Sequence, residues 1–115
     1  MTFEELTKIL LAWPHVQASS SYGTPAFKVA GKLLTRLKED GDSIVLRGVA
    51  DDERATLVAA DPDAYYFTDH YRNYPIVLVR LSACDRDAVV ERLRRTYLDI
   101  LPAKLKSTID ASQLT

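Results

Sequence analysis

The chain has 115 residues, and its hydrophobic share of 47% and charged share of 27% are ordinary for a globular protein with one core. Its formal net charge of -1 excludes a whole-molecule field that favours nucleic acid or anionic membrane, so a basic site has to be a local patch. The single cysteine, Cys84, excludes an internal disulfide and favours a reducing compartment. With an acidic N-terminus and no apolar run of about 18 residues, we expect a soluble cytoplasmic protein without a membrane partner.

The first predicted element is a helix. Thr2 and Glu5 have the spacing of a capping box, and apolar residues then recur at helical intervals up to Trp13. The helix is therefore expected from about Phe3 to Ala12, because Pro14 disfavours helical geometry at the residue before it. The polar, serine-rich residues 15–21 that follow predict a loop.

Three strand patterns come next, joined by short turns. Residues 26–38 alternate in polarity and reverse at Ala30-Gly31-Lys32, a pattern typical of a β-hairpin. A third strand is expected over residues 43–47, after the turn residues 39–42. Short turns between successive strands predict an antiparallel meander.

The second half of the chain alternates helix and strand. We expect a helix that is capped by Asp51 or Asp52, a short aromatic strand over residues 64–68, a loop over residues 69–75, the most apolar strand over residues 76–81, and a last helix from Asp85 to Leu101. This order predicts an α+β fold: an antiparallel sheet of about five strands, with the N- and C-terminal helices packed on one face. A single domain is expected over residues 1–106, followed by a loose tail over residues 107–115.

Strand alternation predicts which side chains share a sheet face. One face is almost entirely apolar, whereas the open face collects five basic residues and no carboxylate, namely Lys28, Lys38, Arg36, Arg47 and Arg80. An ordinary solvated sheet face, on which Lys and Arg cover apolar surface with their methylene stems, explains this pattern more often than a binding site does. The same face also holds Leu34, Val45, Ile76 and Leu78, so we expect a loop or a partner to cover part of it.

Residues 23–32, Gly-Thr-Pro-Ala-Phe-Lys-Val-Ala-Gly-Lys, closely resemble the signature hairpin of the MmcQ/YjbR-like proteins. Residues 70–81 resemble a second, weaker landmark of that family, a histidine or basic loop that leads into an apolar strand. The resemblance covers about Phe3 to Pro102. It implies a compact fold similar to the frataxin/CyaY-like arrangement and the description "DNA-binding", which rests on a proposed two-winged shape. It implies no enzyme activity and no established set of site residues.

Residues with catalytic or ligating chemistry are few and scattered. Cys84 lies between a strand and a helix cap, where a packed, inert thiol is the usual finding. His15 and His70 lie far apart, without zinc-ligand spacing, and the glycines form no phosphate-binding loop. We therefore expect no catalytic residue, no metal and no cofactor.

The remaining hypothesis is a non-catalytic, monomeric protein that contacts DNA through the basic sheet and hairpin face, because basic groups interleaved with aromatic rings suit phosphate contact and base stacking. The alternative is an interaction module whose half-apolar face docks a protein or a small molecule. A third, lower-ranked hypothesis is an enzyme, which a deep pocket with convergent His70, Tyr71 and Arg72 would favour. The candidate nucleic-acid-binding residues are Lys28, Lys32, Arg36, Arg47, His70, Tyr71, Arg72 and Arg80.

Overall fold

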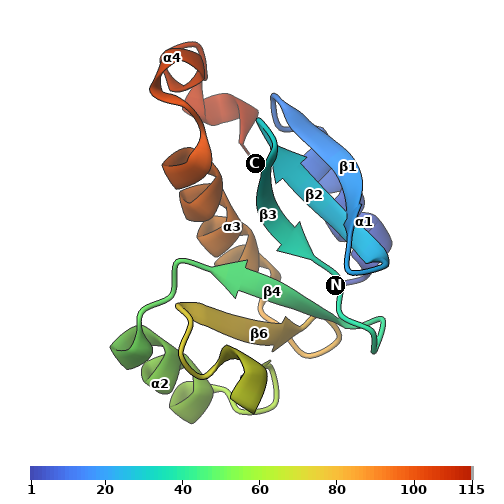
Figure 1. Ribbon diagram of the computed structural model, residues 1–115, viewed down its shortest axis with the longest axis vertical. Coiled ribbons are helices and arrows are strands. Elements are labelled where there is room, and N and C mark those ends of the chain that lie inside the picture. The colour runs from blue at the N-terminus through green and yellow to red at the C-terminus, as the bar shows by residue number, and fades with distance from the viewer. Residues whose placement is uncertain (115) are drawn as a thin grey trace.

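The computed structural model describes residues 1–114, and its strands form two three-stranded antiparallel sheets (Figure 1). The first sheet has the order β1-β2-β3, with the bounds β1 Val16–Ser21, β2 Thr24–Val29 and β3 Lys32–Arg36. The second sheet has the order β4-β6-β5, with the bounds β4 Ser43–Arg47, β5 Tyr65–Tyr66 and β6 Ile76–Arg80. The α+β class is confirmed, but the expectation of one sheet of about five strands is wrong.

The two sheets meet along a seam between β3 and β4. Among the described residues, one isolated bridge joins these strands, between Leu37 and Ile44. Farther along the seam the contact between the strands is made by a side chain: the hydroxyl of Thr35 donates to the backbone carbonyl of Val45 at 2.6 Å. β4 instead forms a full antiparallel ladder with β6. The predicted meander therefore splits after its second strand, and side chains fill the seam.

The expected loop over residues 15–21 is largely a strand, β1. It pairs with β2 in an unbroken antiparallel register that runs from Val16 opposite Val29 to Ser21 opposite Thr24. Only Val16 of this strand is buried, and the other side chains are exposed or half-buried. Backbone hydrogen bonds to β2 therefore define β1, and its polar side chains leave no hydrophobic pattern in the sequence.

Both turns of the first sheet are two-residue turns with left-handed backbone. Tyr22-Gly23 joins β1 to β2 with φ angles of 53° and 78°, and Ala30-Gly31 joins β2 to β3 with φ angles of 50° and 81°. Positive φ at both central residues is the geometry of a type I′ turn, which matches the twist of the strands it joins. The first turn projects the Tyr22 side chain, 87% of which is exposed.

Two helices cover the rear of the sheets (Figure 1). α1 (Phe3–Leu11) lies behind the first sheet, and α3 (Arg86–Ile100) contacts both β3 and β4 and so closes the rear of the seam. Leu10, Leu93 and Tyr97 are fully buried in the hydrophobic cluster between helices and strands. Because the helices occupy the rear, the opposite face of the seam stays accessible.

The other helices are short or peripheral. They are α2 (Asp51–Ala60), α4 (Ala103–Lys106) and the 3-10 turns η1 (Asp69–Tyr71) and η2 (Ala111–Gln113). The expected cap of α2 by Asp51 or Asp52 is wrong: Ala50 is the N-cap and makes no side-chain hydrogen bond. No helix within residues 1–114 combines the length and the hydrophobicity that a bilayer crossing requires.

The expectation of a loose segment after residue 106 is also wrong for the part that can be seen. Leu114 is only 2% exposed and belongs to the main hydrophobic cluster, against which Ile109 also packs. Asp110 caps η2 by accepting a hydrogen bond from the Ser112 N–H at 3.0 Å. Ile109 and Leu114 therefore pack this segment against the rest of the chain. Thr115, the last residue of the expected tail, lies outside the described residues.

Candidate functional site

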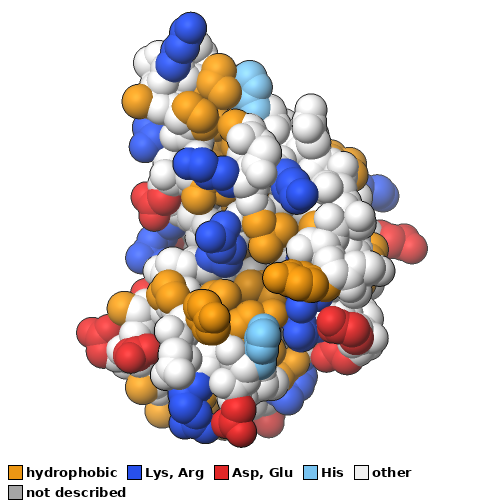
Figure 2. All heavy atoms as spheres, viewed as in Figure 1, with side chains coloured by type: hydrophobic (Ala, Val, Ile, Leu, Met, Phe, Trp, Pro, Cys, Tyr) orange, Lys and Arg blue, Asp and Glu red, His pale blue; other side chains and the backbone are white. Residues whose placement is uncertain are grey.

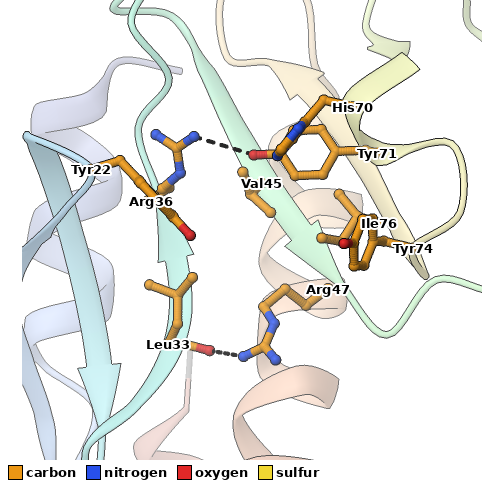
Figure 3. Close-up of a pocket in the computed structure, with 9 residues that line it drawn as sticks. All are labelled: Tyr22, Leu33, Arg36, Val45, Arg47, His70, Tyr71, Tyr74 and Ile76. Atoms are coloured by element: carbon orange, nitrogen blue, oxygen red, sulfur yellow. Dashed lines mark hydrogen bonds between the residues drawn. The ribbon is translucent and has the colours of Figure 1, made fainter. Parts of the chain in front are cut away.

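A hollow of about 270 Å³ opens at the front of the seam, between the two sheets and the loop that precedes β6. Figure 3 shows its lining side chains projecting from β3, β4, the loop and the β1–β2 turn. Figure 2 shows hydrophobic side chains gathered in the hollowed middle of this face, with Lys and Arg side chains beside them. The lining residues are Tyr22, Leu33, Arg36, Val45, Arg47, His70, Tyr71, Tyr74 and Ile76.

A β-bulge in β3 determines which leucine enters the hollow. Lys28 lies opposite Leu33 and Phe27 lies opposite Thr35, so Leu34 is the extra residue. Leu34 is fully buried in the core, which corrects its expected place on the open face, and Leu33 lines the hollow instead. Alternation does place Val45, Ile76 and Leu78 on this side of the second sheet, as expected, where they form a small cluster with Tyr71.

Arg36 forms one wall of the hollow, and its guanidinium is already engaged. Its Nη2 donates to the Tyr71 hydroxyl at 3.2 Å, its Nη1 donates to Thr24 Oγ1 at 3.1 Å, and Glu39 lies 3.4 Å away. Partial burial opposes its charge, but Tyr71 and Glu39 outweigh burial and raise the pKa of Arg36. The side chain is only 6% exposed. Arg36 therefore holds the aromatic residues in place and offers little charge to a ligand.

Arg47 is the half-buried cation that faces the hollow. Its Nη1 donates to the carbonyl of Leu33 and so bridges the seam (Figure 3). Within residues 1–114, no carboxylate lies within 4 Å of the charged group of Arg47, Lys28 or Lys32. Lys28 borders the hollow because it pairs with Leu33, and Lys32 is exposed next to the β2–β3 turn. Lys28 and Arg47 are therefore available to an anion at the front, whereas Lys32 pairs with the buried Val29 and so lies on the side of the first sheet that faces the core.

A buried arginine that the sequence analysis did not single out, Arg54 of α2, positions the loop that forms the far wall. Its guanidinium donates to the carbonyls of Tyr71, Tyr74 and Ile76 at 3.0, 3.1 and 3.0 Å, and to the carbonyl of Arg72 at 2.8 Å. One side chain thus gathers four carbonyls of the residues 71–76. The sequence carried no signal for this role, since those carbonyls converge only in the folded chain.

The aromatic rings on the rim come from two segments far apart in the sequence. Tyr22 and Tyr74 are 87% and 56% exposed. The Arg36 guanidinium carbon lies 5.1 Å from the Tyr22 ring centroid, and the His70 ring lies 4.7 Å from the ring of Tyr71. The sequence signal that could have placed Tyr22 at the rim is the Tyr22-Gly23 pair, which is typical of a two-residue hairpin turn. This signal is informative only once β1 is recognised as a strand.

Two of the predicted site residues lie away from the hollow. Arg80 shares the front face of the second sheet but lies at the end of the sheet away from the hollow. Its guanidinium carbon lies 4.0 Å from the Tyr66 ring centroid, and its Nη1 donates to the carbonyl of Asp63. Arg72 is exposed and forms an ion pair with Asp69 at 2.6 Å. Arg72 therefore lies outside the hollow that His70 and Tyr71 line, so the described residues do not bring these three side chains together in one pocket. The structure does bring together Arg36, Arg47, His70 and Tyr71, with Lys28 alongside.

Comparison with known proteins places this chain in a family. The model of the YjbR family matches residues 11–99. Uncharacterized proteins of Mycobacterium bovis and Mycobacterium tuberculosis are each 29% identical to this chain over 99 residues, which cover 84% of this chain and 70% of the relative. The family match spans well over half of the chain and includes every residue that lines the hollow. The chain therefore belongs to the YjbR family.

Proposed function

We propose that this protein binds DNA through the hollow at the seam and the adjoining front face of the first sheet. The observation that carries the proposal is the composition of the lining, which combines an apolar floor, tyrosine rings and the guanidinium of Arg47 and includes no carboxylate. An apolar floor with exposed rings suits the faces of bases, and cations beside it suit phosphates.

The strength of binding follows from the number of available cations. Lys28 and Arg47 supply about two phosphate contacts, for which log K falls against log salt with a slope of about −1.4 on a single strand. A fourfold rise in salt then weakens binding roughly sevenfold. The overall charge of -1 adds no long-range attraction, so we expect binding in the micromolar range or weaker at physiological salt.

A second candidate, docking of an apolar small molecule or protein segment, is favoured by the floor residues Leu33, Val45 and Ile76. The two candidates differ in the forces on which they depend. Apolar docking is nearly insensitive to salt and depends on the half-buried Ile76. Leu34 and Leu78 are fully buried and contact no ligand in either case.

Fluorescence anisotropy of labelled DNA tests the proposal. Wild type is compared with Lys28→Glu, Arg47→Glu and the matched charge reversal Lys8→Glu, which lies on α1 behind the first sheet. We expect Lys28→Glu and Arg47→Glu each to weaken binding by about tenfold or more, and Lys8→Glu to leave it within about twofold. No binding at low salt, or equal affinities for all variants, overturns the proposal. Salt-insensitive binding that is lost in Ile76→Ala supports apolar docking instead.

A further inference from the structure

We infer that the hollow receives one unstacked base of a single-stranded nucleic acid, held between Tyr22 and Tyr74. This inference rests on the proposed function and specifies it: the ligand is a single strand, and duplex DNA is a poor substitute.

Exposed aromatic rings are concentrated at this one place. Among the described residues, three large hydrophobic side chains are exposed, Leu11, Tyr22 and Tyr74, and the two tyrosines both line the hollow. Figure 3 shows them on opposite sides of it. Single exposed hydrophobic residues are common on protein surfaces, but two rings that flank an apolar floor form a stacking site for a flat ligand.

The backbone that carries each ring is held in position before any ligand arrives. Tyr22 has a left-handed backbone with φ of 53°, a conformation that a residue with a bulky side chain seldom adopts, and its ring lies beside the fixed guanidinium of Arg36. Tyr74 is anchored through its carbonyl by Arg54 at 3.1 Å, and its ring lies 6.4 Å from that of His70. A pre-positioned backbone reduces the entropy that binding would otherwise remove.

The size of the hollow suits a small flat group such as a base. Its volume of about 270 Å³ lies below the range of roughly 300–1,000 Å³ that is usual for pockets that enclose a cofactor or drug-sized ligand. The proposed arrangement has a flat base inside the hollow and its sugar and phosphate outside. Arg47 lines the hollow and Lys28 pairs with Leu33 on the same face of the first sheet, so positive charge is present on both sheets beside the hollow.

A second hollow indicates that the ligand is a chain. It has about 290 Å³ and shares Arg47, Tyr74 and Ile76 with the first hollow, beyond which it extends to Thr96 and Asp99 near the end of α3. Tyr74 therefore stands between two adjoining hollows, as a ring does between successive bases of a strand. Paired and stacked bases of a duplex cannot enter either hollow without being flipped out.

The test compares a short oligothymidylate with a hairpin duplex of the same charge by anisotropy at low salt. The ring is removed in Tyr22→Asn, which suits the left-handed turn, and retained in Tyr22→Phe. We expect the single strand to bind at least about tenfold more tightly than the duplex. Tyr22→Asn should lower the affinity for the single strand alone by about tenfold, and Tyr22→Phe should bind both ligands as wild type does.

Equal binding of strand and duplex, both unaffected by Tyr22→Asn, overturns base insertion while leaving DNA binding in place. If the wild-type protein binds neither the single strand nor the duplex, both base insertion and the proposed DNA binding are overturned. Tyr74→Ser provides the same comparison from the other side of the hollow if Tyr22→Asn does not fold. In that variant an unchanged preference for the single strand contradicts the inference.

Discussion

Replacing Arg54 by Met is the most informative perturbation of the site, because it removes the guanidinium but keeps most of the side-chain volume. Arg54 is 6% exposed and donates to four loop carbonyls, and its guanidinium carbon lies 4.1 Å from the Phe67 ring centroid. The loop between β5 and β6 has few other anchors of comparable burial. We therefore expect this substitution to loosen the wall of the hollow that carries Tyr71 and Tyr74.

The expected loss of stability in Arg54→Met follows from the carbonyl groups that lose the guanidinium as a hydrogen-bond donor. The Tyr71 and Tyr74 carbonyls also accept from the N–H groups of Tyr74 and Ile76, so they keep one partner each. The fully buried bond to the Tyr71 carbonyl is still expected to contribute about 2 kcal/mol, because water cannot replace the donor there. The other bonds and the contact with Phe67 add about 2 kcal/mol together. The expected loss is about 4 kcal/mol, a large part of the roughly 5–15 kcal/mol that stabilises a domain.

Urea denaturation measures this loss, and native-state hydrogen exchange locates it. The free energy of unfolding should fall by about 4 kcal/mol, and the amides of residues 71–76 should lose protection in conditions where the amides of β2 keep theirs. Arg54→Lys retains the charge but not the fork of donors, so it should recover less than half of the loss. A change below about 1 kcal/mol with unchanged protection of residues 71–76 refutes the role given to Arg54.

Three further outcomes are expected. Partial burial raises the pKa of Asp40, but hydrogen bonds from Ser43 and Asp42 and the charge of Arg80 outweigh burial and lower that pKa. The carboxylate therefore stabilises the fold at pH values above its unfolded-state pKa, and this stabilisation is lost as the pH falls. Urea melts should show stability declining below about pH 4 and Asp40→Asn should flatten that decline, whereas an unchanged pH dependence in the variant would contradict this role. Tyr22→Asn should raise the free energy of unfolding by about 0.5 kcal/mol, because relief of the left-handed backbone exceeds the lost contact with Arg36, and a loss of 1 kcal/mol or more in thermal melts would be the opposite result. Leu114→Ala should lower the free energy of unfolding by about 2 kcal/mol in the same melts, and no change there would show that the segment after residue 106 does not contribute.

Where the chain's local signals were strong, sequence reasoning found the structure. The capping box of α1 is confirmed by the hydrogen bond from the Glu5 N–H to the Thr2 hydroxyl at 3.1 Å. The predicted faces of β4 and β6 are confirmed, since alternate residues of these strands divide between the core and the front cluster. The family resemblance of residues 23–32 is confirmed by the match to the YjbR model.

The wrong predictions concern features that depend on contacts between residues far apart in the sequence. β1 has one buried side chain, so no alternation marked it, and its strand state depends on pairing with β2. The bulge at Leu34 reverses the alternation of β3, and no residue type announces a bulge without glycine. Arg36 looked like a surface cation but is buried against Tyr71, and Arg54 looked like an ordinary helix residue. Long-range contacts determine the roles of both arginines.

The central claim is that nucleic acid binds in the hollow between the sheets, and amide chemical-shift mapping tests it most directly. Uniformly ¹⁵N-labelled protein is titrated with a short oligothymidylate at low salt. We expect the largest shifts at Tyr22, Leu33, Arg47 and Tyr74, which share the hollow. Shifts confined to α1 and α2, or no shifts up to millimolar oligonucleotide, would contradict the claim.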